Sequence, residues 1–425
     1  MTTPTLPRPR TRRPADRKQQ IARVAARLFH DRGYDGVRVA DIAAAVGVTT
    51  PALYRHYPTK RALLYEAIQG ALDQVDEAFA VPDGPAPEVL RRTLTAFARL
   101  ALVRRDVWTL MQRELRRLPD DQRTSVISRY ARIADRLAGS VQATRASSGS
   151  WDGPAAANAA LISHAVLAAF GSVAQYRPSA PRGRTEQILT AAAGALATAP
   201  LAAPPADGQA GALSSLPSAL AGLESRREEL LAAATRLFRQ RGYLAVTTDE
   251  IGAAAGMTGP SVYHYFTSKA DLLNAAVSRA AEWLSLGRAQ VAVRGDPPGP
   301  ALGHLLRHYI DISLSSSDLL GVYLTEREHL PRAQAQRMTK ASMENVACYR
   351  TLLRVARGDV TGPEADVLIF AALGVINDLV RRASFRERPQ LADDLARLST
   401  AVLFAPLPAT TEPPAHRHDA SSIRL

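Results

Sequence analysis

A stretch of 38 residues that occurs twice constrains this chain more than any other feature of its sequence. Residues 27–64 align without a gap with residues 236–273, and 17 of the 38 positions are identical. The chain therefore contains two copies of one folding unit, 209 residues apart. The identical positions include residues that fix turns and core contacts: Phe29/Phe238, Gly33/Gly242, Tyr34/Tyr243, Ile42/Ile251, Gly47/Gly256, Thr49/Thr258, Pro51/Pro260, Tyr54/Tyr263, Lys60/Lys269 and Leu63/Leu272.

The repeated stretch has the pattern of two short helices joined by a tight turn. Ile42 and Val46 lie four residues apart, as apolar positions on one helix face do. Gly47 follows where a helix that ends in a left-handed residue needs no side chain. Thr49 is a typical N-cap for the next helix, and Pro51 falls in its first turn, where a missing N–H costs nothing.

The second of these helices is expected to bury one face and to expose small and basic groups on the other. Leu53, Tyr54 and Tyr57 have apolar helical spacing, and Lys60 opens a third helix. The residues left to face outward are Thr50, Ala52, Arg55 and His56. This pattern predicts a helix-turn-helix whose second helix fits the major groove of DNA.

On these residues the sequence resembles the TetR/AcrR family of bacterial transcriptional regulators, twice over. The stretches that carry the resemblance are AARLFHDRGYDGVRVADIAAAVGVTTPALYRHYPTKRALL and AATRLFRQRGYLAVTTDEIGAAAGMTGPSVYHYFTSKADLL. The resemblance implies an all-α fold of two tandem units. Each unit would have an N-terminal three-helix DNA-binding domain and a C-terminal helical domain for ligand binding and dimerisation. It further implies a cytoplasmic, nucleoid-associated regulator. The sequence contains no Gly-rich phosphate loop and no GxSxG motif, so neither an enzyme nor a cofactor is expected.

The rest of the chain divides at changes of composition. Residues 200–222 are rich in Ala, Pro, Gly and Ser and almost uncharged, as linkers are. The expected order is a disordered basic arm (1–15), a first helix-turn-helix domain (16–80), a first C-terminal helical domain (81–199), the linker, a second helix-turn-helix domain (223–284), a second C-terminal helical domain (285–405) and a disordered tail (406–425). The arm is either a solvated tail or a segment that orders on DNA.

The repeat also continues weakly into the C-terminal domains. Glu114, Leu118 and Pro119 match three residues of the second half at an offset of 212, namely Glu326, Leu330 and Pro331. Both halves are therefore expected to be whole regulators.

Composition sets further limits. The net charge of +13 favours a polyanionic partner, although 49 of the 53 basic residues are arginine, a bias that GC-rich coding also produces. The single cysteine, Cys348, excludes an internal disulfide framework and suits a reducing compartment. The sequence has no apolar N-terminal signal region and no uninterrupted apolar run of 18 residues, so no membrane partner is expected.

The family resemblance assigns roles to individual residues of the first copy. Those expected on the phosphate side are Thr49, Tyr54, His56 and Lys60, and those on the base side are Thr50, Ala52 and Arg55. In the base-side role, Arg55 could form a bidentate contact with guanine. The alternative for Arg55 is another phosphate contact. Arg38 stands where the family usually has Ser or Thr as a helix cap, and we interpret it as a direct phosphate ligand. Tyr57 and Phe266 are expected to pack inside.

The second copy offers a different surface. Its candidate DNA-binding residues are Thr247, Thr258, Gly259, Ser261, Tyr263, His264, Tyr265 and Lys269. Thr247 and Glu250 have the spacing of a capping box. Residues 8–61 hold 13 basic and 4 acidic groups, whereas residues 224–273 hold 6 of each. The first head should therefore supply most of the salt-dependent affinity. The alternative function is a ligand-binding interaction protein whose second head does not read DNA.

The tandem arrangement bears on assembly. By resemblance, residues 154–198 and 363–403 are the two halves of a four-helix bundle. The linker of 23 residues could stretch to about 76 Å, so it permits an intramolecular pseudo-dimer. Two unlike heads would then read a non-palindromic operator in double-stranded DNA, with half-sites about 34–36 Å apart. A homodimer of chains with four heads is the competing arrangement.

The family resemblance further implies that a small effector, lipophilic to suit an apolar pocket, binds inside the C-terminal domains. The candidate pocket residues are Trp108, Met111, Tyr130, His164 and Phe170 in the first half, and His308, Tyr309, Tyr323, Met343 and Phe370 in the second. Each of them also fits an ordinary core position. His304 and His308 have the spacing of a two-histidine metal site, but no HExxH motif surrounds them and no pattern supports a third ligand such as Asp311, so no metal is expected.

Overall fold

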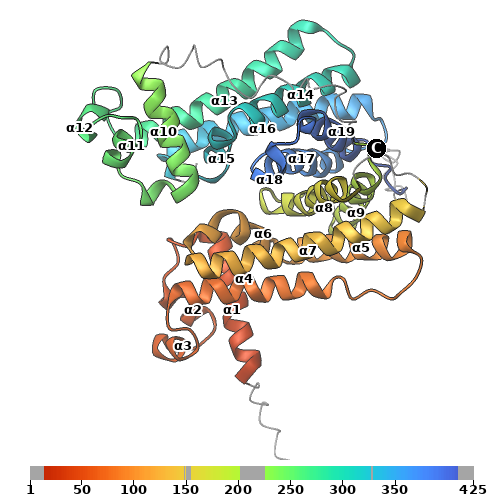
Figure 1. The fold of residues 1–425 in the computed structure, drawn as a ribbon, viewed down its shortest axis with the longest axis horizontal. Coiled ribbons are helices and arrows are strands. Elements are labelled where there is room, and N and C mark those ends of the chain that lie inside the picture. The colour runs from red at the N-terminus through yellow and green to blue at the C-terminus, as the bar shows by residue number, and fades with distance from the viewer. Residues whose placement is uncertain (1–13, 148, 150–154, 202–224, 327–328, 410–425) are drawn as a thin grey trace, which may run out of the picture.

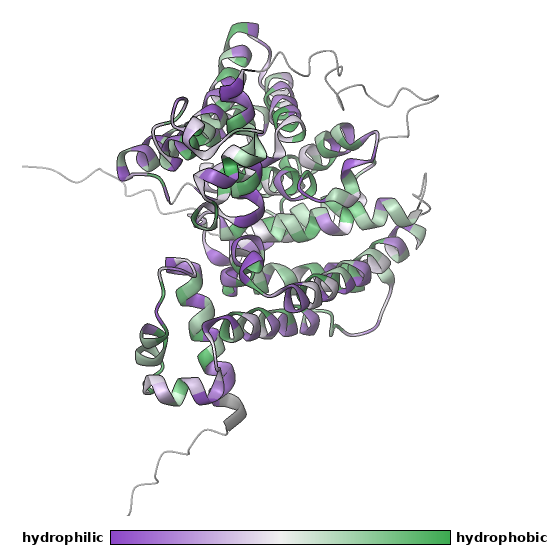
Figure 2. Ribbon diagram, turned by 60° about the vertical axis from the view of Figure 1, so that its left-hand side comes forward, coloured by the Kyte–Doolittle hydropathy of each residue, from purple (hydrophilic) through white to green (hydrophobic). Residues whose placement is uncertain are grey.

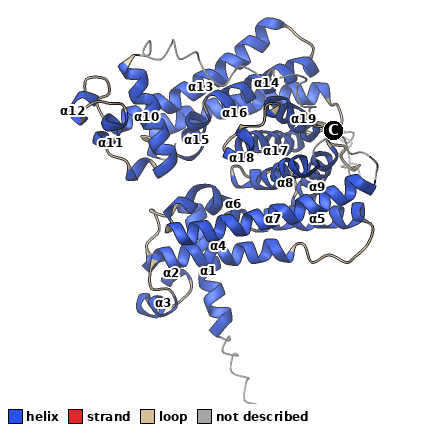
Figure 3. Ribbon diagram, in the orientation of Figure 1, coloured by secondary structure: helices blue, strands red, loops and turns tan. Residues whose placement is uncertain are grey.

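The computed structural model describes residues 14–147, 149, 155–201, 225–326 and 329–409. Within these residues the chain is helical and contains no strand (Figures 1 and 3). The expected arm, linker and tail fall largely on residues 1–13, 202–224 and 410–425, which lie outside the described part.

The first half begins with a three-helix head and continues into a set of longer helices. Its elements are α1 (Pro14–Arg32), α2 (Val39–Ala45), α3 (Thr50–His56), α4 (Lys60–Glu77), α5 (Ala86–Val103), α6 (Arg105–Thr109), the π-helical turn η1 (Leu110–Glu114), the 3₁₀ turns η2 (Leu115–Arg117) and η3 (Ser172–Ala174), α7 (Asp120–Ser147), α8 (Ala155–Gly171) and α9 (Arg182–Thr198).

The second half repeats this plan. Its elements are α10 (Arg226–Arg241), the 3₁₀ turn η5 (Tyr243–Ala245), α11 (Thr248–Ala254), α12 (Gly259–Val262), α13 (Lys269–Arg294), α14 (Pro298–Ser315), α15 (Ser317–Thr325), α16 (Arg332–Ala356), α17 (Gly362–Leu379), α18 (Ala383–Arg386) and α19 (Leu391–Leu403). The helix α13 runs unbroken through the domain boundary expected at residue 284, so one rigid element joins the second head to the helices behind it.

Two helical segments of the C-terminal domains are interrupted. Helix α6 ends at Thr109, and the chain continues as the π-helical turn η1 and then the 3₁₀ turn η2. Helix α17 ends at Leu379, and the separate short helix α18 follows. Both interruptions lie where the two halves of the chain meet, since residues of both segments line one cavity.

The core of the molecule is a bundle of four helices, two from each half. Helices α8 and α9 pack against α17 and α19 within the one chain (Figure 1). A Cβ on Gly374 would lie 3.1 Å from Cβ of Ser172 and 3.2 Å from the carbonyl oxygen of Ala168, so the glycine lets α17 approach α8 closely.

Polar contacts also cross between the halves. The side chains of Arg184 and Glu364 form an ion pair that is almost fully buried. Arg388 Nη2 donates to Oδ1 of the buried Asn158 at 2.7 Å. Because buried polar groups are costly without partners, these pairs fix how the halves meet.

One segment of the described chain, Ala156–Ala174, is long and apolar enough to cross a membrane by length and composition alone. Most of it is buried inside the protein, where α8 is surrounded by α7, α9 and α17. Figure 2 accordingly shows strongly hydrophobic ribbon in the middle of the molecule, between helices of mixed character. A helix that is apolar all round is what a central position in a bundle requires.

Candidate DNA interface and ligand cavities

The turn of the first head has the expected local structure. Gly47 has φ of 67°, in the left-handed region that glycine adopts without strain. Oγ1 of Thr49 accepts a hydrogen bond from the N–H of Ala52 at 3.3 Å, and Pro51 lies in the first turn of α3. The predicted helix-turn-helix and its cap are therefore confirmed, and Gly256 repeats the turn with φ of 66°.

The outer face of α3 presents several of the expected side chains. Arg55, His56 and the N-cap Thr49 are exposed, whereas Thr50 and Ala52 are half-buried. Among the residues expected on the apolar face, Leu53 and Tyr57 are buried, but Tyr54 is 46% exposed. The apolar placement of Tyr54 was wrong, and its exposure instead fits the contact role that the family resemblance gives it. Phe266, like Tyr57, packs inside as expected.

The two lysines expected on the phosphate side point inward instead. Nζ of Lys60 donates to the carbonyl oxygen of Tyr34 and lies 4.1 Å from the centre of that tyrosine ring. Nζ of Lys269 donates to the carbonyl oxygens of Tyr243 and Val246 at 3.0 and 2.8 Å. Burial lowers the pKa of both ammonium groups. Each lysine thus braces the loop after the first helix of its head.

The caps of α2 and α11 differ in the way their sequences indicate. Thr247 and Glu250 form the predicted capping box, with Oε2 of Glu250 accepting from the Thr247 N–H at 2.8 Å. In the first head Oδ2 of Asp41 accepts a hydrogen bond from the Arg38 N–H at 2.8 Å. This is the same contact from the third helical residue back to the N-cap N–H that Glu250 makes in the second head. The Arg38 side chain is exposed. It is therefore free to reach a phosphate.

The recognition helix of the second head is shorter than that of the first. Helix α12 covers Gly259–Val262, so His264 and Tyr265 lie in the turn that follows. The sequence GPSV has lower helix propensity than TPAL in the first copy, because glycine, serine and valine form helix less readily than alanine and leucine. His264, Tyr265, Tyr263 and Thr258 are exposed, and Ser261 is half-buried.

An acidic group stands beside this second recognition helix. A Cβ on Gly259 would lie 1.7 Å from Oδ1 of Asp249, so the glycine makes room for the carboxylate. The corresponding residues of the first copy are Thr50 and Ala40. The second surface therefore carries a negative charge at a place where the first is neutral, which weakens its attraction for phosphate.

Two buried carboxylates, which the sequence showed only as a matched pair, connect the heads to the helices behind them. Oε1 of Glu114 accepts a hydrogen bond from the N–H of Tyr34 at 3.2 Å. Oε2 of Glu326 accepts one from the N–H of Tyr243 at 3.1 Å. The persistence of this glutamate in both halves was the signal that could have identified the contact. Each carboxylate links the C-terminal helices to the loop after Gly33 or Gly242.

A cavity of about 820 Å³ lies in the second half, against the first. Four of the five candidate residues of this half line it: Tyr309, Tyr323, Met343 and Phe370. Tyr176 of the first half stacks on the Phe370 ring with 3.8 Å between centres. The fifth candidate, His308, lines a different cavity of the second half, of about 640 Å³, together with His304 and Asp311. Its Nε2 lies 2.9 Å from the carbonyl oxygen of Trp283.

A second cavity, of about 470 Å³, lies where the halves meet, and three candidate residues of the first half line it: Trp108, Met111 and Tyr130. His164 lies behind this wall. Its ring stacks on Tyr130 with 5.9 Å between centres and meets the Phe385 ring of the second half edge-on at 5.3 Å. Phe170 is fully buried and packs on Phe97, as the ordinary-core alternative for this residue predicts. In the described chain no three His, Cys, Asp or Glu side chains gather as a metal site.

Comparison with known proteins adds to this picture. Residues 21–67 and 230–276 both match the family described as bacterial regulatory proteins, tetR family. The chain is 35% identical over 60 residues to the HTH-type transcriptional repressor KstR2 of Mycolicibacterium smegmatis, covering 14% of this chain and 29% of that protein. It is 40% identical over 67 residues to the HTH-type transcriptional activator FasR of the same species, covering 16% and 31%.

The matched stretch thus spans less than a third of these curated relatives. Among solved structures, a TetR-family transcriptional regulator from Bordetella parapertussis is similar with a TM-score of 0.38 and 23% identity, over 41% of this chain and 94% of that one. The two family matches coincide with the two heads that the structure shows on α1–α4 and α10–α13. The chain therefore carries, twice in one polypeptide, the DNA-binding domain of the tetR family of bacterial regulatory proteins.

Proposed function

We propose that this protein is a ligand-responsive repressor of transcription that leaves its operator when a small lipophilic effector binds. The observation that carries the proposal is the placement of the two heads. They lie at opposite ends of the molecule but toward the same side, with the intrachain bundle between them (Figure 1). Such a pair of heads suits adjacent major grooves of one duplex. We place the protein in the bacterial cytoplasm, at the nucleoid.

The two heads would contribute unequally. The first offers Arg38, Thr49, Tyr54, Arg55 and His56 on an exposed surface. The second has a shorter recognition helix and the Asp249 carboxylate beside it. The site read should therefore be asymmetric, with most of the salt-dependent affinity in one half-site. Lys60 and Lys269 are left out of the proposed contacts because they brace their own heads.

The larger cavity supplies a physical route from effector to head. Leu324 and Thr325 line it at the end of α15, and the next residue is Glu326, which holds the Tyr243 N–H. An occupant that moves the end of α15 would shift this carboxylate and the loop at the base of the second head. The effector would release DNA if it bound more tightly to a conformation in which the spacing of the two heads does not fit the operator.

The test is a mobility-shift titration on duplexes from the protein's own locus, using the single variants Arg55→Ala and His264→Ala. The exposed Arg99, which pairs with Glu186 on the far side of the first half, provides a matched control in Arg99→Ala. We expect Arg55→Ala to weaken specific binding by roughly 1–3 kcal/mol, and His264→Ala to weaken it by less. An unchanged footprint with His264→Ala would make the second head an interaction module. No salt-sensitive binding to any duplex would refute the proposal.

A further inference from the structure

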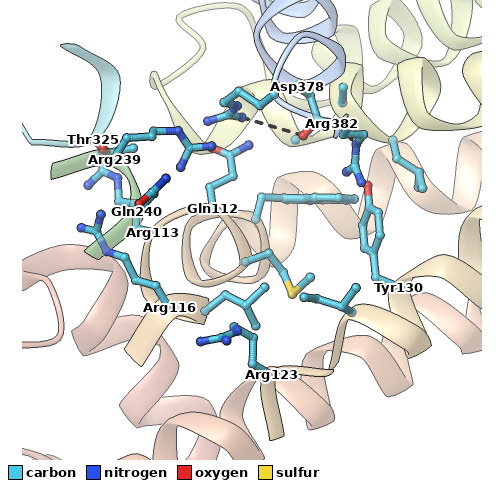
Figure 4. A pocket seen from close by; sticks show the side chains of 18 of the residues that line it. Gln112, Arg113, Arg116, Arg123, Tyr130, Arg239, Gln240, Thr325, Asp378 and Arg382 are labelled. Carbon is cyan, nitrogen blue, oxygen red and sulfur yellow. Dashed lines mark hydrogen bonds and ion pairs between the residues drawn. The ribbon is translucent and has the colours of Figure 1, made fainter. Parts of the chain in front are cut away.

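The cavity between the two halves has an unusual lining. Seven arginines and two aspartates contribute to its walls, and they come from both halves of the chain. Figure 4 shows Arg116 and Arg239 on one side of the cavity and Arg382 with Tyr130 on the opposite side. The remaining wall is apolar and includes Trp108, Met111, Leu115 and Leu167. A space lined in this way offers a positive end and a hydrocarbon end.

Among the arginines that line this cavity, Arg239 has the least compensation of its charge by the protein. In the described chain no hydrogen bond or ion pair joins its guanidinium to a carboxylate. Burial, together with the charges of Arg381, Arg116 and Arg386, lowers the pKa of Arg239 to about 10, and Asp318 opposes this only in part. A partly buried cation among like charges is unfavourable unless an anion joins it.

The comparison of the two copies shows that this arrangement is specific to the second. In the first copy the matching position is His30, and its Nδ1 lies 2.7 Å from Oγ1 of Thr109, a closed pair. In the second copy Gly321 replaces the threonine. A Cβ on Gly321 would lie 2.5 Å from Cδ and 2.6 Å from Nε of Arg239. Two linked replacements have thus opened a path for the guanidinium into the cavity.

We infer that this cavity binds an anionic amphiphile, a carboxylate or phosphate monoester on a hydrocarbon body, with Arg239 as its principal anion ligand. The head group would replace the missing counter-charge of Arg239, and the hydrocarbon would lie against Trp108 and Met111. A volume of about 470 Å³ admits a small molecule and excludes a duplex. The DNA backbone is therefore not the occupant.

An effector role for this site rests on the proposed function, but binding itself does not. Arg239 and Gln240 belong to α10 of the second head, whereas Arg116 belongs to the first half and Arg382 follows α17. An anion held among them would tie the second head to both halves of the bundle.

Calorimetric titration of the full chain without DNA tests the inference. The probes are decanoate and decyl phosphate, compared with decanol, decyltrimethylammonium and inorganic phosphate, all below micellar concentration. We expect the two anionic amphiphiles to bind at least about tenfold more tightly than the neutral, cationic and tail-less probes, and less tightly as salt rises. The stronger of the two identifies the head group. Equal binding of all five probes, or none by either anion, would overturn the inference.

Two variants locate the site. Arg239→Gln should weaken the better anion about tenfold or more, without lowering the melting temperature of the ligand-free protein, since it removes a repelled charge. The double variant Arg239→His with Gly321→Thr rebuilds the closed pair of the first copy and should fold and lose binding equally. Arg99→Gln, a surface control, should bind normally. Unchanged anion binding in both site variants would contradict the inference, whatever DNA binding shows.

Discussion

Arg116 and Glu326 form an ion pair of 2.7 Å between the two halves of the chain, and the Glu326 carboxylate is fully buried. The same carboxylate holds the N–H of Tyr243 at the base of the second head. The guanidinium lies so close to Gly242 that a Cβ there would approach it to 3.0 Å. The first half therefore contacts the second head directly.

Removal of Arg116 should destabilise the protein strongly. Arg116→Ala leaves a buried carboxylate short of its cation, and we expect the free energy of unfolding to fall by roughly 3 kcal/mol in chemical denaturation. Adding Glu326→Gln should recover part of the loss. Arg123, whose partner Asp120 is almost fully exposed, is the matched control, and Arg123→Ala should cost at most about 1 kcal/mol. Equal losses in the two single variants would argue against the pair.

Light scattering should give the mass of one chain, 45.7 kDa, at micromolar concentration. The reason is that the helices which would form a dimer interface are already paired inside the chain. A mass near twice this value would show that the bundle forms between chains, which would support the four-headed homodimer instead.

Close packing at Gly374 should make this position intolerant of larger residues. Gly374→Val places atoms against Ser172 and the Ala168 carbonyl, and we expect a loss of about 2 kcal/mol in thermal unfolding. Gly194 lies in α9, and a Cβ added to it would meet no other atom within 4 Å, so Gly194→Ala should gain about 0.5–1 kcal/mol. Stability gained at both positions would mean that α8 and α17 do not cross as closely as described.

Lys60 should matter for stability rather than for phosphate binding. Lys60→Met removes the charged hydrogen bond to the Tyr34 carbonyl, and we expect the first head to lose about 1.5 kcal/mol. The slope of DNA affinity against salt concentration should stay the same, because no phosphate contact is lost. A slope reduced by about one, with stability unchanged, would restore the phosphate role expected from the sequence.

His164 should make the junction of the halves sensitive to acid. Burial, aided by the charge of Arg382, lowers the pKa of His164 to about 4 from its ordinary value of 6.5. Between pH 4 and pH 6.5 the imidazole of His164 binds a proton in the unfolded chain but not in the folded one. The free energy of unfolding is therefore highest above pH 6.5 and decreases as the pH falls toward 4. The shift corresponds to roughly 3 kcal/mol at most.

The comparison that isolates this effect is wild type against His164→Gln. The difference between their free energies of unfolding at pH 7.5 serves as the reference. As the pH falls to 4.5, the wild type should lose more stability than the variant. Parallel curves for the two proteins over this range would show that His164 is solvated in the folded state.

Sequence reasoning identified features that depend on neighbours within a few residues. The left-handed Gly47, the Thr49 cap and the Thr247–Glu250 capping box follow from backbone preferences and side-chain reach, so they could be predicted without knowledge of the fold. The burial of Tyr57 followed from helical spacing. Tyr54 did not, because spacing alone cannot tell a core position from a partly exposed one on a short helix.

The chain's own sequence thus determined that it has two TetR-type heads, where their turns and caps lie, and that their surfaces differ in charge, since all of these are local properties or properties of composition. Only the tertiary structure decided that α8 and α9 pair with α17 and α19, that Lys60 turns inward, and that Arg239 passes over Gly321 into a cavity. Those contacts join residues far apart in the sequence, and the same apolar faces could pair within a chain or between chains. Their outcome is set by packing and by the burial of charge, which no single segment encodes.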